Sequence, residues 1–175
     1  MKSKVISLSA ISAAFVAIAL IIGGFFEMTD LFMLILASVF VMLPLYLNSF
    51  KGSFLAYLAG GVIAVLLTFN FALIFPAYFG FFGIYPIVKC KMLQKNFSKA
   101  WGIVIGLIWL IAVSYGCYFY YTLILGGVFT GLPEWIYDYI IYGIGLIAIV
   151  LFFIFDRFVV VMRLLLDKYL NRIIK

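Results

Sequence analysis

The side chains best suited to chemistry in this sequence lie on one short stretch of predicted helix. Ser114, Tyr118 and Tyr121 are spaced by four and then three residues, which places their hydroxyl groups on one helix face. Further polar and aromatic residues are expected near the same ends of the helices: Glu27, Asn70, Trp135 and Tyr137. Aromatic rings with a few hydroxyl, amide and carboxylate groups are what a pocket for a flat, modest-sized molecule requires. The surplus of acids over bases in this region favours a neutral or cationic ligand.

The same residue types have an ordinary explanation. Tyrosine and tryptophan gather at the water–lipid interface of many membrane proteins, and acids remain on the outer side wherever basic residues stay inside. The sequence alone therefore leaves two interpretations open for this region, a ligand pocket and an interfacial aromatic belt.

Catalysis and metal binding are not expected. The chain has no histidine, which excludes the usual catalytic triads, zinc-protease motifs and histidine haem ligands. No glycine-rich phosphate loop ends in Lys-Ser or Lys-Thr, so the protein does not hydrolyse ATP by the P-loop route. Cys90 and Cys117 lack partners at metal-ligand spacing, and we predict neither a metal nor a cofactor. No acid or base is expected deep in a span, which leaves an ion-driven carrier without a coupling residue.

Composition indicates the helices that must position these residues. The chain is 69% hydrophobic and 10% charged, too few polar residues to cover a water-soluble domain. We expect one all-α membrane domain over residues 1–175, with about six transmembrane helices at 5–26, 31–50, 53–69, 71–88, 100–125 and 136–156. The segment 52–88 allows two short helices that turn at Asn70, which we prefer, or a re-entrant hairpin.

The basic residues predict the orientation in the membrane. All twelve Lys and Arg residues fall before the first span, after the second, after the fourth or after the sixth. The remaining connections between spans carry only acids. Positive charge near span ends stays on the cytoplasmic side, so both termini are predicted to be cytoplasmic. Without an aromatic–basic groove no nucleic-acid partner is expected, and the positive charge instead suits anionic lipid of the inner leaflet.

The last segment predicts an interaction surface. Residues 157–175 form an amphipathic extension of the sixth span, expected to lie along the inner leaflet or against a cytosolic partner. Together with the basic loop 89–99, this tail supports an alternative function. The protein would then be a membrane scaffold that recruits a partner or anionic lipid and binds no small ligand.

Small residues on the first span predict a close helix contact. Their spacing of four residues forms two pairs: Ala10 with Ala14, and Ala13 with Ala17. With about six helices, both termini inside and no energising motif, the chain resembles an S component of an energy-coupling factor (ECF) transporter. The stretch from Phe79 to Lys89 is also similar to a segment of S-component-like proteins of Gram-positive anaerobes.

The resemblance implies a function and a location. S components are bacterial plasma-membrane subunits that capture vitamins and related micronutrients on the outer side. They dock on a shared module made of a coupling membrane protein and two ATPases. The four alanines of the first span would form the docking face, and the polar and aromatic residues named above would bind the ligand. The signatures of the thiamine, riboflavin, biotin and folate members are absent, so the resemblance carries no particular substrate.

Overall fold

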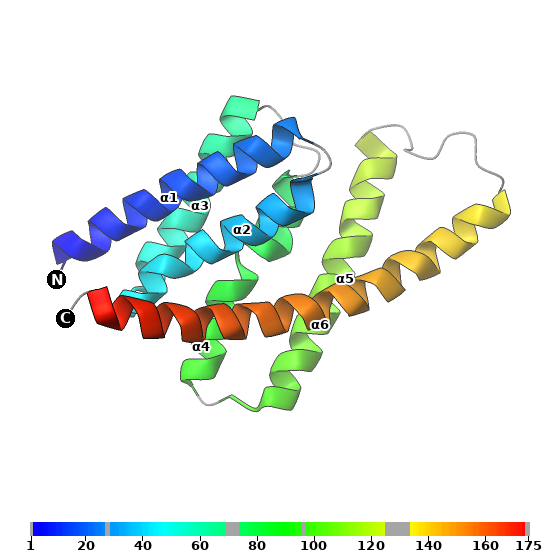
Figure 1. Cartoon of the computed structure of the whole chain (residues 1–175). Coiled ribbons are helices and arrows are strands. Elements are labelled where there is room, and N and C mark those ends of the chain that lie inside the picture. The colour runs from blue at the N-terminus through cyan, green and yellow to red at the C-terminus, as the bar shows by residue number, and fades with distance from the viewer. Residues whose placement is uncertain (1, 27–28, 69–73, 96, 125–133, 174–175) are drawn as a thin grey trace.

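The computed structural model describes residues 2–26, 29–68, 74–95, 97–124 and 134–173. Helices make up nearly all of this part of the chain, and no strand occurs in it. The helices are α1 (Lys2–Phe25), α2 (Asp30–Met42), η2 (Leu43–Leu47), α3 (Phe50–Thr68), η3 (Ile74–Phe82), α4 (Tyr85–Gln94), α5 (Lys99–Ile124) and α6 (Glu134–Ile173). In Figure 1, α1, α2 and α3 form one group of helices, while α5 and the first half of α6 diverge from it.

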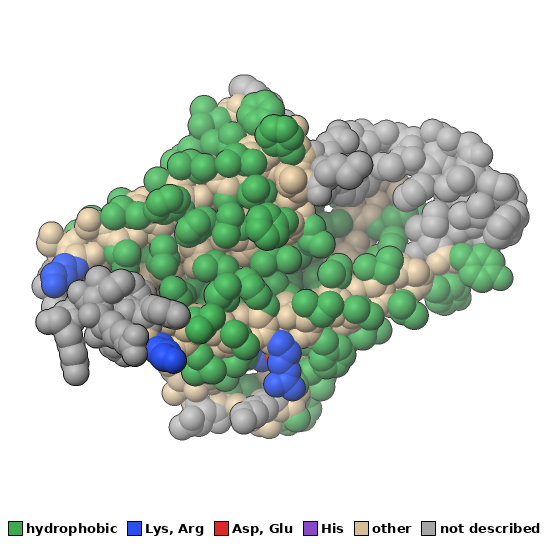
Figure 2. Space-filling model, in the orientation of Figure 1, with side chains coloured by type: hydrophobic (Ala, Val, Ile, Leu, Met, Phe, Trp, Pro, Cys, Tyr) green, Lys and Arg blue, Asp and Glu red, His purple; other side chains and the backbone are tan. Residues whose placement is uncertain are grey.

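Five helical segments of the described chain are long and apolar enough to cross a membrane: Ser3–Phe25, Asp30–Leu47, Phe50–Thr68, Ala100–Tyr120 and Tyr142–Leu166. Large apolar side chains cover the face shown in Figure 2, as on a protein whose solvent is lipid. The predicted all-α class is confirmed for the described residues, and the segments have the length and composition of a multi-pass membrane protein.

The fourth predicted span, 71–88, is not one regular α-helix. The π-helix η3 ends at Phe82, and α4 begins at Tyr85 with Pro86 in its first turn. Where the helix is irregular, neighbouring side chains bond the backbone carbonyls: the Tyr57 hydroxyl donates to the Phe79 carbonyl at 3.0 Å, and the Ser38 hydroxyl lies 2.6 Å from the Phe82 carbonyl. Such bonds let an irregular helix persist away from water.

Together, η3 and α4 run back along α3. Gly61 of α3 lies against Phe79, whereas Tyr57, one turn earlier, lies against Gly83. At the far end, the Gln94 side chain donates to Oδ1 of Asn48 at 2.8 Å, in the turn before α3. The chain thus returns to the end where α3 began, as both predicted arrangements of the segment 52–88 require. The predicted turn at Asn70 lies outside the described residues.

The small residues of α1 serve two different surfaces. A Cβ atom at Gly60 of α3 would lie 2.5 Å from Cγ1 of Val16 and 2.9 Å from the carbonyl oxygen of Ala13, so α1 and α3 touch only because Gly60 lacks a side chain. Ala13 and Ala17 are buried, whereas Ala10 and Ala14 are exposed. Two of the four alanines therefore pack inside the protein, and the other two lie on its outer surface.

The predicted tail continues α6 without a break. Val159 is buried, and Met162 and Leu166 pack against the same core as the membrane helices. Nη1 of Arg163 donates to the carbonyl oxygen of Cys90 at 2.8 Å and ties the tail to α4. The first turns of the tail therefore pack on the protein itself.

Candidate functional site: an apolar cavity backed by a buried ion pair

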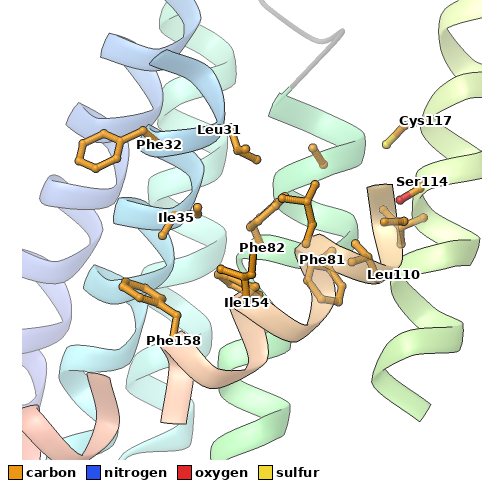
Figure 3. A pocket seen from close by; sticks show the side chains of 15 residues that line it. Leu31, Phe32, Ile35, Phe81, Phe82, Leu110, Ser114, Cys117, Ile154 and Phe158 are labelled. Carbon is orange, nitrogen blue, oxygen red and sulfur yellow. The ribbon is translucent and has the colours of Figure 1, made fainter. Parts of the chain in front are cut away.

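A cavity of about 480 Å³ lies between α2, η3, α5 and α6. Figure 3 shows 15 side chains that line it. Thirteen of these are hydrocarbon, and five are phenylalanine: Phe32, Phe81, Phe82, Phe155 and Phe158. Among the described lining residues, the side chains that carry a polar atom are Ser114, with its hydroxyl, and Cys117, with its thiol, both on α5. The arrangement suits binding of a largely apolar molecule, with one polar corner to orient it.

Packed aromatic rings hold the wall formed by η3 and α6. Phe81 is fully buried, and its ring centroid lies 5.6 Å from that of Phe155 and 4.7 Å from that of Tyr85. On α5, Gly106 lets this layer come close, because a Cβ atom there would lie 2.8 Å from the Phe152 ring. Interlocked rings of this kind have few alternative arrangements, which favours a preformed wall.

Behind that wall, a buried ion pair joins α4 to α6. Nζ of Lys89 lies 2.5 Å from Oδ1 of Asp156, and the two residues are only 7% and 6% exposed. The Tyr85 hydroxyl donates to the same carboxylate oxygen. Because an unpaired buried charge is strongly destabilising, burial of each of these two ions requires the opposite charge of the other.

The ion pair bears on one sequence-based expectation. No acid or base was expected deep in a span, yet Asp156, predicted to close the sixth span, is buried within the apolar segment Tyr142–Leu166. The pattern that indicates the pair is an opposite charge at the corresponding ends of two predicted spans, with Lys89 after 71–88 and Asp156 closing 136–156. Taken alone, each residue looks like an ordinary charged residue in water at the end of a span.

The structure places one of the predicted ligand-binding residues in the cavity lining, Ser114. Tyr118, one turn further along α5, is half-buried and does not line the cavity. Two others, Glu27 and Asn70, lie outside the described residues. The backbone of the remaining three lies in α5 and α6, but their side chains are not among those described: Tyr121, Trp135 and Tyr137.

The phenylalanines of the wall were not predicted as site residues. Phe81 and Phe82 belong to a stretch that the sequence analysis identified only for its similarity to S-component-like proteins. A phenylalanine in an apolar span looks the same in the sequence whether its side chain faces lipid, another helix or a cavity. Only the positions of Leu151, Phe155 and Phe158, spaced by four and then three residues, indicate that these side chains share a helix face.

Comparison with known proteins finds no family model, no curated protein and no solved structure that matches this chain.

Proposed function

We propose that this protein is the substrate-capturing membrane subunit of an ATP-driven importer of a vitamin or related micronutrient, and that it holds its ligand in the cavity between α2, η3, α5 and α6. The cavity is the observation that carries the proposal. Its volume of about 480 Å³ falls within the range of roughly 300–1,000 Å³ typical of small-molecule sites. A mainly apolar lining with few polar atoms is also typical of such sites. The bacterial plasma membrane, with both termini cytoplasmic, is part of the same proposal.

Energy for import would come from a separate module, the coupling membrane protein with its two ATPases. The exposed side chains of Ala10 and Ala14 offer α1 as a smooth surface for a helix of that module. Beside them, a shallow groove between α1 and α3 is lined by Ala10, Ala13 and Ala59, among others. Ala17 supports this surface from behind by packing inside the protein.

The alternative function, a scaffold acting through the basic loop and the tail, has less support. Lys89, which the sequence assigned to the basic loop, lies in α4 and pairs with Asp156. Arg163 of the tail donates to the Cys90 carbonyl. Both cations are therefore engaged within the protein. The exposed basic side chains Lys91, Lys95, Arg157 and Lys168 suit contact with anionic lipid of the inner leaflet.

Affinity purification from the native host in mild detergent tests the proposal. The wild-type protein should bring down a coupling membrane protein and two ATPases in fixed proportion. Ala14→Leu should lose these partners yet remain folded, because its side chain is exposed on α1. The matched control is Ala112→Leu on α5, also exposed, which should retain them. A chain that is recovered without ATPases, under conditions that preserve a known complex of the same host, contradicts the ATP-driven importer.

A further inference from the structure

We infer that the ligand is an uncharged, lipophilic molecule that enters the cavity sideways from the bilayer, through an opening between α2 and α6. The inference rests on the proposed function of this cavity as the ligand site and adds the substrate class and the route of entry. Two independent observations carry it, the chemistry of the lining and the position of the opening.

The lining selects against charge. Among the described residues that line the cavity, none is charged, and the polar atoms are one hydroxyl and one thiol. A cation or anion placed against these described residues would lose its hydration without gaining a counter-ion from them. The charges of Lys89 and Asp156 pair with each other, and neither residue is in the described lining; Tyr85, which donates to Asp156, stacks on Phe81 of the wall. Of the neutral and cationic ligands that the sequence favoured, only the neutral class fits these walls.

The opening lies on the side of the molecule. Phe81 and Phe155, at the wall, are buried, whereas Phe32 on α2 and Ile154 on α6 are 63% and 62% exposed although both line the cavity. Exposed lining residues mark a mouth, and this mouth is entirely hydrocarbon on its two described sides.

The mouth belongs to the part of the helices that would cross the bilayer. Phe32 lies in the apolar segment Asp30–Leu47, and Ile154 lies in the apolar segment Tyr142–Leu166. A rim of this composition meets the lipid chains, and a molecule dissolved among those chains reaches the cavity without passing through water. The polar corner at Ser114 would then orient a single hydroxyl or carbonyl group of an otherwise hydrocarbon-rich ligand.

Cys117 provides a native reporter for the route, because it lines the cavity. The other cysteine, Cys90, is buried elsewhere and is removed by Cys90→Ala. In proteoliposomes, the lipophilic reagent N-phenylmaleimide should label Cys117, whereas a membrane-impermeant stilbene-disulfonate maleimide should not. Both reagents should label the denatured protein. Equal labelling of the native protein by both reagents, or labelling by neither, overturns membrane-phase entry.

A rim variant tests the position of the mouth. Ile154→Trp places a larger side chain at the opening and should slow N-phenylmaleimide labelling several-fold. The control is Ile149→Trp on the same helix, because Ile149 is exposed but does not line the cavity. This control should label at the wild-type rate. Equal rates for the two variants overturn a mouth between α2 and α6.

The same lipophilic chemistry belongs to a free metabolite and to the acyl chain of a membrane lipid. Organic extraction of the purified protein, followed by mass spectrometry, separates the two sources. A discrete neutral compound in a fixed ratio to protein supports the inference, and recovery of host phospholipids alone overturns the free metabolite. Recovery of ATPases in the purification described above depends on none of these results. The proposed importer function and the proposed lipophilic ligand can therefore be refuted independently of each other.

Discussion

Removal of the carboxylate at position 156 should destabilise the protein more than any surface change. In Asp156→Leu, the ammonium group of Lys89 would remain in a site where the residue is 7% exposed, and the Tyr85 hydroxyl would lose its acceptor. Breaking a buried pair by removal of one partner costs about 3–5 kcal/mol. We expect a loss of this size in the free energy of unfolding. Lys89→Met should cost less, because Tyr85 still donates to the carboxylate.

The double variant Lys89→Met/Asp156→Leu separates pairing from general damage at the site. With both charges replaced by apolar groups, no ion is left unpaired, and most of the stability should return. The assay is equilibrium unfolding of the four proteins in mixed micelles at increasing denaturant, with helicity followed by circular dichroism. Single variants that lose less than about 1 kcal/mol, the value of a surface pair, would refute the reasoning. A double variant that loses the sum of the two single losses would refute it as well.

Two further changes test contacts that position the helices. Gly60→Val should destabilise the contact of α1 with α3 by about 1–3 kcal/mol, because Val16 already fills the space that a Cβ atom at position 60 would need. Gly116→Ala is the control and should be neutral or slightly stabilising, because no atom lies within 4 Å of a Cβ there. Equal thermal stability of the two variants would contradict this packing. Arg163→Gln should cost about 1.5 kcal/mol by loss of a charged hydrogen bond to α4, and should speed proteolysis of the tail. Arg157→Gln, whose side chain is exposed, should leave the tail protected, and unchanged proteolysis of both variants would argue against docking of the tail on α4.

The sequence predicted the helices well because the membrane imposes simple requirements. Long apolar runs such as Val5–Phe26 and Ala100–Leu125 must become helices to satisfy their own backbone groups. The structure has α1 at Lys2–Phe25 and α5 at Lys99–Ile124. In the fourth span the sequence pattern indicated an apolar segment but not the helix irregularity between η3 and α4. That irregularity depends on hydrogen bonds that Tyr57 and Ser38 donate from other helices.

The site was less predictable because it depends on gaps and pairings between helices. A spacing pattern reports which side chains share a face; of the predicted face on α5, Ser114 lines the cavity and Tyr118 does not. It does not report how far α5 diverges from α2, which sets the size of the cavity. Nor does it report that Asp156 and Lys89 meet, because each occupies a span end where solvated charges are common.

Native mass spectrometry of the intact protein tests most directly whether a small molecule occupies the cavity. Protein released from lipid nanodiscs should carry one discrete added mass in the wild type and in Ala112→Trp, whose altered residue is exposed away from the cavity. Ser114→Trp places a large ring among the lining residues and should lose that mass while keeping its helicity. An added mass that persists in Ser114→Trp, or a wild-type protein that carries none, would contradict the account.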